Sequence, residues 1–150
     1  MTPLASFTNK RNARTAPNIM TRFLAIQNTY EMIEMALFNE DSIVESITID
    51  KKEATKTIVT VLNALLERNN CPLNSLDFFA VNQGPGPFTT LRVVIATMNG
   101  LAFATNIPLV GVDGLDVLCA EEQDASFPIT VALLNAFNSD VYYALQVSDK

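Results

Sequence analysis

The sequence contains no histidine, and it has only two cysteines among its 150 residues. The lack of histidine excludes Ser-His-Asp and Cys-His nucleophile activation, histidine metal ligands and imidazole general bases. Cys71 and Cys119 lie far apart in the sequence and outside any metal-binding spacing, which favours reduced thiols of a cytosolic protein. No catalytic, cofactor-binding or metal-binding residue is predicted.

Basic residues are also scarce, because ten Lys and Arg against sixteen Asp and Glu give a net charge of −6. Binding of nucleic acid normally needs a basic patch, so a role with tRNA or DNA would have to be shared with a partner. The longest apolar run is interrupted by Arg92, Asn99 and Asn106, and we therefore expect a soluble chain with no membrane-spanning segment. The apolar content of 49% fits one globular domain.

Residues 1–20 carry three basic residues, no acid and no hydrophobic periodicity. This composition is typical of a disordered leader. An organellar transit peptide is an alternative on composition, and Met20 is an alternative start, since the first strand follows it directly.

From residue 21 the pattern predicts three hairpin-linked strands followed by alternating helices and strands. The predicted elements are strands at Phe23–Ile26, Met32–Phe38 and Ile43–Ile49, a helix from Glu53 to about Asn69, a strand at Leu76–Val81, a helix at Phe88–Thr105, a strand at Leu109–Val112, a short helix at Leu115–Ala120, and strands at Ile129–Leu134 and Val141–Val147. The first three strands form an antiparallel meander, and the next two add to it in parallel.

The predicted fold class is therefore α/β, with a mixed five-stranded sheet and helices. We predict a leader at residues 1–20, a lobe at 21–125 and a strand pair at 126–150. A lone two-stranded ribbon is marginal in water, so the last pair either packs on the lobe or begins a second lobe.

The fourth strand turns into the most apolar helix through the segment Gly84-Pro85-Gly86-Pro87. Glycine permits dihedrals or close approaches that a Cβ would forbid, and proline fixes φ, so the corner is rigid. A glycine-rich loop before a helix is also one way to bind phosphate. Here two prolines have no N–H to offer and no Gly-Lys-Thr ending follows, so a stiff turn is favoured over an anion site.

Small residues recur every fourth position along the helix predicted at Phe88–Thr105, at Ala96, Gly100 and Ala104. A glycine inside a helix costs roughly 1 kcal/mol relative to alanine, and close approach of another backbone would offset that cost. Two neighbours remain open for this stripe, namely the first helix of the same chain or another molecule.

Arg92 is the single charge within this apolar helix. Arginines inside apolar surroundings are usually paired, and their stems lie along apolar surface. We therefore expect Arg92 to pair with Asp113 or Asp116 rather than to bind a ligand.

Five segments carry a family resemblance: Phe23-Leu24-Ala25-Ile26, Gly84-Pro85-Gly86-x-Phe88-Thr89-x-Leu91-Arg92, Gly100-Leu101-Ala102, Ile107-Pro108-Leu109-Val110-Gly111-Val112 and Val141-Tyr142-Tyr143-Ala144. Together they resemble the TsaB family, also called YeaZ, over about residues 22–147. TsaB is the non-catalytic subunit of the bacterial tRNA threonylcarbamoyladenosine machinery. The resemblance implies an actin/hexokinase/Hsp70-like (ribonuclease H-like) lobe, in which the Gly-Pro-Gly-x-Phe-Thr helix entry is the family motif.

The sequence also departs from what the resemblance leads one to expect. An ATP-binding member of the superfamily places an aspartate after the first strand to hold hydrated Mg²⁺, and this chain has Gln27. Pro87 replaces a serine of the family, Thr90 a glycine, and Ala54 a histidine, while Asn135-Ala136-Phe137 stands where the family often has Asp-x-Arg. Of these departures, Gln27 argues against a nucleotide site, because an amide cannot replace the charge of the aspartate.

By resemblance, the chain is a cytoplasmic scaffold that pairs with the homologous catalytic subunit TsaD or with itself, joins the ATPase TsaE, and meets tRNA only through the complex. The expected interface comprises the outward part of the first helix and Thr90, Ala96, Gly100, Phe103 and Ala104. Two alternatives remain: a small-molecule kinase or ATPase lobe, which Gln27 disfavours, and a diverged homodimeric module without a working partner.

Overall fold

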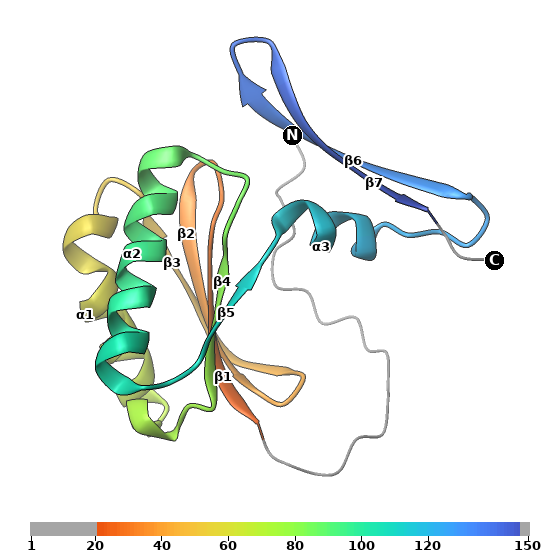
Figure 1. The fold of residues 1–150 in the computed structure, drawn as a ribbon. Helices are drawn as coiled ribbons and strands as arrows, with labels where there is room; N and C mark the ends of the chain where they lie inside the picture. Colours follow the sequence, from red (N-terminus) through yellow and green to blue (C-terminus); the bar gives the residue numbers. More distant parts are fainter. Residues whose placement is uncertain (1–20, 148–150) are drawn as a thin grey trace.

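The computed structural model describes residues 21–147, so the predictions made for residues 1–20 lie outside the described residues. Figure 1 shows a five-stranded sheet with two long helices beside it and a separate two-stranded ribbon. The elements are β1 (Arg22–Asn28), β2 (Met32–Asn39), β3 (Ser42–Asp50), α1 (Ala54–Arg68), the 3-10 turn η1 (Leu73–Ser75), β4 (Phe78–Asn82), α2 (Phe88–Thr105), β5 (Leu109–Val112), α3 (Gly114–Glu121), β6 (Ile129–Phe137) and β7 (Asp140–Val147). The predicted order of elements is confirmed.

The sheet has the strand order β3-β2-β1-β4-β5. β1 pairs with β2 and β2 with β3 in antiparallel register, whereas β4 joins β1 and β5 joins β4 in parallel. The central strand β1 therefore receives an antiparallel neighbour on one side and a parallel one on the other. The mixed five-stranded sheet is confirmed.

The first turn is shorter than predicted. Gln27 and Asn28, expected in the turn, continue β1 and pair with Glu34 and Ile33 of β2. The turn is instead closed around Thr29, whose amide donates to the carbonyl of Met32 at 2.8 Å and whose hydroxyl accepts from the Met32 amide at 3.1 Å. A hydroxyl that satisfies nearby backbone groups stabilises a tight turn, which leaves both amide side chains on the strand.

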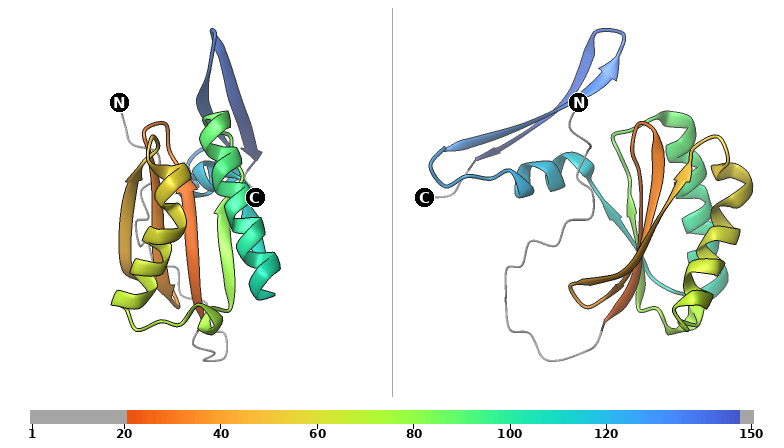
Figure 2. Two further views of the ribbon diagram at one scale, coloured as in Figure 1. Left: turned by 90° about the vertical axis from the view of Figure 1, so that its left-hand side faces the viewer. Right: turned by 180° about the vertical axis from the view of Figure 1, so that it is seen from behind.

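Both long helices cover the same face of the sheet, α1 over β2 and β3, and α2 over β1, β4 and β5 (Figure 2). The core lies between the helices and the sheet, where the largest fully buried side chains include Leu24, Ile33, Leu62, Phe79 and Met98. Strand side chains alternate, so those of one parity enter this layer. On the opposite face Phe23 stacks between Phe38 and Phe78, with ring centroids 4.5 Å apart in each pair.

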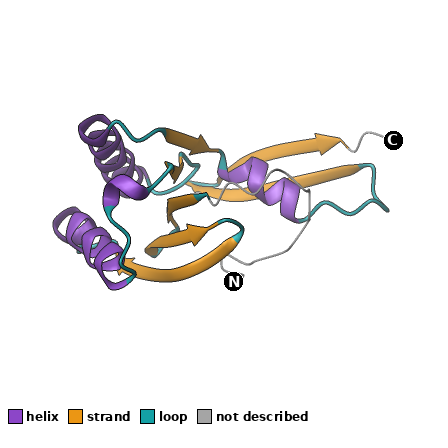
Figure 3. Cartoon of the chain, turned by 90° about the horizontal axis from the view of Figure 1, so that it is seen from below, coloured by secondary structure: helices purple, strands orange, loops and turns teal. Residues whose placement is uncertain are grey.

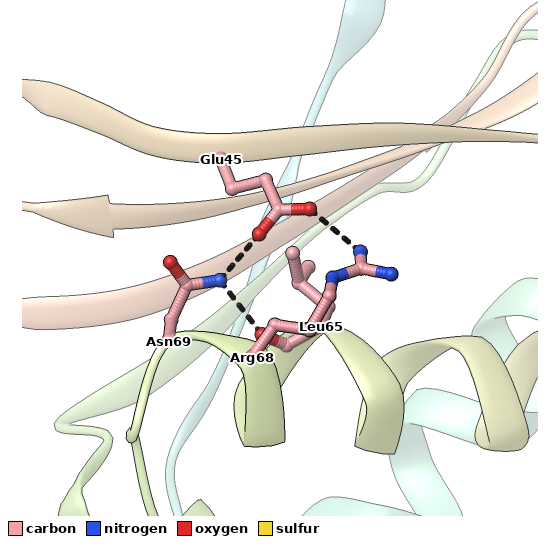
Figure 4. A network of polar contacts seen from close by, with 4 residues as sticks. All are labelled: Glu45, Leu65, Arg68 and Asn69. Atoms are coloured by element: carbon pink, nitrogen blue, oxygen red, sulfur yellow. Dashed lines mark hydrogen bonds and ion pairs between the residues drawn. The ribbon is translucent and has the colours of Figure 1, made fainter.

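A polar network ties the end of α1 to the edge strand β3 (Figure 4). Glu45 of β3 accepts from Arg68 and from the side-chain amide of Asn69, both at 2.6 Å, and Asn69 also donates to the carbonyl of Leu65 at 2.8 Å. Asn69 thereby satisfies one of the carbonyls left open at the helix end. Hydrogen bonds from Asn69 and Arg68, together with the positive charge of Arg68, hold the pKa of Glu45 below its ordinary value.

The lowered pKa of Glu45 has a testable consequence. Since the folded state favours the ionised carboxylate, the contribution of Glu45 to stability is present above its unfolded pKa and is lost as the pH falls through the folded value. We expect Asn69→Ala to move this pKa upward, because the Asn69 hydrogen bond is the largest cause of the shift. A carboxyl-carbon NMR titration of both proteins measures it, and an unchanged Glu45 midpoint would contradict the assignment.

The predicted strand pair forms an antiparallel ribbon, β6 with β7, outside the five-stranded sheet. α3 packs against this ribbon, and Figure 3 shows it running alongside the two strands. Ala132 and Leu134 of β6 and Cys119 of α3 are buried. The boundary between the lobe and the strand pair, expected at residue 125, stays a prediction. α3 lies before that residue in the sequence but packs against the ribbon that follows it.

By length and composition alone, α2 is long and apolar enough to cross a membrane. No other helix within residues 21–147 meets these two criteria. The expectation that no apolar run reaches that length was wrong, because one arginine and one amide residue, Arg92 and Asn99, leave the mean hydropathy of its 18 residues at 1.2. α2 packs along the sheet through Val94 and Met98, which are buried, and through Ile95 and Leu101, which are partly buried.

Candidate functional site

The motif Gly84-Pro85-Gly86 forms the corner between β4 and α2. Gly84 has a φ of +117°, in the region that favours glycine, and the Gly84–Pro85 peptide bond is cis. The Gly84 amide donates to the side-chain oxygen of Asn82 at 2.7 Å, and its carbonyl accepts from the amide of Gly114 at 2.7 Å. A Cβ at Gly84 would lie 3.1 Å from Leu91 of α2. The corner thus fixes the start of α2 and touches the start of α3, as a stiff turn should.

A buried polar side chain faces this corner from β1. Asn28 is 7% exposed, and neither its side-chain oxygen nor its nitrogen has a hydrogen-bond partner among the described residues. A Cβ at Gly86 would lie 3.1 Å from the Asn28 side-chain nitrogen, so the second glycine of the motif makes room for this amide. Sequence reasoning placed Asn28 in a turn and missed it, since a lone asparagine before a threonine gives no signal of burial.

The buried amide of Asn28 predicts a stabilising substitution. A polar group without a partner in the interior lowers stability by about 1–3 kcal/mol, and an apolar side chain of similar shape removes that cost. We expect Asn28→Val, which also suits a strand position, to raise the free energy of unfolding by about 1 kcal/mol. Urea unfolding measures the change. A less stable variant would show that the amide is satisfied by a group from outside the described chain.

The outer face of α2 is exposed along its length. Ala96, Gly100 and Ala104 are exposed, and a Cβ at Gly100 would meet nothing within 4 Å. Phe103 is 89% exposed and Phe88 71%. α1 therefore does not cover the small-residue stripe. Of the two neighbours that the sequence left open, the first helix of the same chain is excluded. We call Phe88, Ala96, Gly100, Phe103 and Ala104 the outer α2 face.

The expected pairing of Arg92 with Asp113 or Asp116 was wrong. Arg92 is exposed, and its guanidinium carbon lies 5.2 Å from the centroid of the Phe88 ring one helical turn away, a cation–π arrangement. Asp113 instead caps α3, where its carboxylate accepts from the amides of Leu115 at 2.8 Å and Asp116 at 3.3 Å. Arg92 thus belongs to the rim of the outer α2 face.

The remaining interface and motif positions divide between the two sides of α2. Thr90, assigned to the interface, is half-buried, and Thr89 of the family motif is exposed. Leu91 points toward the Gly84 corner. The five interface residues named from the sequence thus lie on α2, although Thr90 is less accessible than the others.

The first hairpin reaches the ribbon through Tyr30. Its hydroxyl donates to the carbonyl of Asn135, and its ring meets Phe137 edge to face with centroids 5.6 Å apart. Burial and the neighbouring Tyr142 raise the pKa of Tyr30 above its ordinary value. At the position where an aspartate was expected, Gln27 donates to Glu34 at 2.8 Å. Residues at the departures from the family pattern thus serve contacts within the chain.

Comparison with known proteins adds sequence and structural relatives. Residues 43–149 match the profile of the family TsaD, tRNA N6-adenosine threonylcarbamoyltransferase. The TsaB proteins of tRNA threonylcarbamoyladenosine biosynthesis from Escherichia coli K12 and Haemophilus influenzae are 27% and 26% identical over 82% and 85% of the chain. The solved structure of YeaZ from Pseudomonas aeruginosa superposes with a TM-score of 0.68 at 26% identity, covering 87% of this chain and 61% of that one.

The chain belongs to the TsaD family, since the family profile matches well over half of its length. Within it the chain is similar to TsaB, or YeaZ, in a diverged form, and the YeaZ structures confirm that its α/β fold is that of YeaZ. The chain spans 54% of the length of both TsaB relatives, about half.

Proposed function

We propose that this chain takes part in the biosynthesis of tRNA threonylcarbamoyladenosine as a scaffold subunit without catalytic residues of its own. Its relatives in E. coli and H. influenzae are named as biosynthesis proteins of this modification. The sequence offers no histidine, and Gln27 stands where the resemblance leads one to expect a metal-holding aspartate. The chemistry then lies with a partner, a cytoplasmic TsaD-like catalytic subunit.

The observation that carries this proposal is the outer α2 face. Phe103 of α2 is almost fully exposed, and Phe88 of the same helix is mostly exposed. They lie beside a stripe of small residues that permits close approach of a second helix. Exposed apolar groups gathered on one surface mark interaction sites. A homologous subunit of the same fold would present helices equivalent to α1 and α2. Pairing of these helices with those of this chain would bury the outer α2 face and the matching apolar surface of the partner. TsaE and tRNA join through that pair.

Co-expression of this chain with the TsaD of the same organism tests the proposal, with the complex analysed by size-exclusion chromatography and light scattering, with and without ATP. We expect a stable one-to-one species. Elution of the chain without TsaD under all conditions would overturn the scaffold role and favour a diverged module that has lost its partner. Restoration of the tRNA modification in cells depleted of TsaB then tests whether the pair is active.

A further inference from the structure

The turn between β6 and β7 has a backbone conformation that two of its three residues disfavour. Phe137, Asn138 and Ser139 have φ values of 64°, 50° and 69°. A two-residue hairpin turn with positive φ at both central residues usually contains Asn-Gly or a similar pair, and a bulky residue is rarely found at positive φ. Asparagine suits such a turn, whereas phenylalanine and serine do not. Strain of this kind persists only where the surrounding structure holds it. We call residues 137–139 the ribbon turn.

The contacts that hold the ribbon turn come from β6 and from the first hairpin. The ladder between β6 and β7 is irregular between Asn135 and Phe137, so regular strand pairing does not fix this point. The amide of Phe137 instead donates to the side-chain oxygen of Asn135 at 2.8 Å. The carbonyl of Asn135 accepts from the hydroxyl of Tyr30, whose ring also meets the Phe137 ring edge to face. Edge-to-face pairs are favourable beyond the area that they bury. One side chain of the first hairpin thus contacts both residues.

Tyr30 is itself held firmly at its backbone. Its carbonyl accepts from Nζ of Lys51 at 2.6 Å. The preceding residue, Thr29, closes the hairpin with its amide and its hydroxyl, both of which are hydrogen-bonded to the backbone of Met32. A group that is already ordered loses less conformational entropy when it makes a contact. The first hairpin therefore presents the Tyr30 side chain to the ribbon from a fixed base.

We propose that Tyr30 is a latch, which holds the ribbon turn in its left-handed conformation and fixes the ribbon to the first hairpin. β6 and β7 pair with each other and pack against α3, so these three elements form one unit. α3 joins this unit to β5, and the carbonyl of Gly84 accepts the amide of Gly114 at that connection (Figure 1). Tyr30 supplies a second attachment to the five-stranded sheet. Release of Tyr30 lets the ribbon turn relax to negative φ and lets the unit move about the connection between β5 and α3.

NMR of the isotope-labelled full chain tests the latch, because scalar couplings and backbone chemical shifts report φ. We expect positive φ at Phe137 in the wild type and negative φ in Tyr30→Ala. Tyr30→Phe keeps the ring and removes the hydroxyl donor, so a mixture of both conformations is expected. Tyr143→Ala, at a 65% exposed tyrosine of β7, is the matched control and should keep the positive φ. A ribbon turn that keeps positive φ in Tyr30→Ala overturns the proposal.

Amide exchange measures how far the latch suppresses opening of the ribbon turn. Exchange of the Phe137 amide is expected to become faster on the order of tenfold in Tyr30→Ala, since a hydrogen bond and a ring pair are lost together. Adding Ser139→Gly to this variant relieves strain at one position and should slow the exchange again. Exchange at the wild-type rate in Tyr30→Ala would show that Asn135 holds the turn without the latch, against the proposal.

Residual dipolar couplings test the attachment of the ribbon separately from the conformation of its turn. In the wild type, the five-stranded sheet and the ribbon should align as one body. In Tyr30→Ala we expect smaller couplings in the ribbon than in the sheet, because the unit of α3, β6 and β7 then moves. One shared alignment in that variant would show that the contact between Gly84 and Gly114 suffices, and Tyr30 would then be no latch. These measurements do not involve the outer α2 face, so their outcome is separate from the proposed function.

Discussion

Gly100→Leu is expected to abolish co-purification with a TsaD-like subunit while the variant stays folded. In the free chain a Cβ at this position meets nothing within 4 Å, and Gly100 is exposed, so we expect leucine to extend into solvent. Leucine also favours the helix over glycine by up to about 1 kcal/mol. In a close helix pair the same side chain fills the space that the opposing backbone needs, and overpacking costs about 1–3 kcal/mol or more at such a contact.

The stability and the pairing of this variant can therefore be measured apart. Circular dichroism should show an unchanged or slightly higher melting temperature, and affinity capture of TsaD should fail. Ala120→Leu adds the same side chain to an exposed position of α3 and serves as the control that still binds TsaD. Undiminished binding by folded Gly100→Leu would remove the outer α2 face from the interface and would require the partner to dock elsewhere.

Gly84→Ala and Gly100→Ala are expected to change stability in opposite directions, although both add one methyl group to a glycine. At Gly84 the φ of +117° strains any L side chain, and the new Cβ lies 3.1 Å from Leu91. We expect a loss of about 2–3 kcal/mol there, from backbone strain and crowding. At Gly100 the methyl group enters open space inside a helix, and we expect a gain of about 0.5–1 kcal/mol.

Urea unfolding of the two variants beside the wild type measures this difference. The corner also holds α3, because the Gly84 carbonyl accepts the amide of Gly114. Gly84→Ala should therefore loosen the ribbon as well, which amide exchange at β6 and β7 reports. Equal stability of the two variants would show that the corner relaxes freely and is not the rigid turn described above.

The bounds of α2 and β5 could be predicted from the sequence because local signals agree there. Prolines and glycines precede α2, an asparagine in left-handed conformation at Asn106 ends it, and Pro108 precedes β5. The last residues of β1 were harder to predict, since Gln27 and Asn28 are residue types that are common in turns. Pairing with β2 overrides that local preference, because a strand end inside a sheet is decided by its neighbour.

The partners of Arg92 and of the small-residue stripe could not be predicted, since both depend on how the helices rotate on the sheet. Helical periodicity places Val94 and Met98 away from the small-residue stripe of α2, and both are buried in the structure. It could not say whether α1 would reach Gly100, nor that Asp113 would be used as a helix cap. The packing of α3 on the ribbon likewise follows from tertiary contacts that no local pattern encodes.

The central position of β1 has a consequence for the order of folding. Short turns join β1 to β2 and β2 to β3. Pairing of β4 with β1 instead closes a long loop, since Arg22 and Asp77, which are hydrogen-bonded at the start of these two strands, are 55 residues apart. Closing a long loop costs more entropy, so local hairpins form before distant strand pairs do. The glycine-proline corner follows β4 and thus assembles late, so its variants should mainly accelerate unfolding and leave the folding rate almost unchanged.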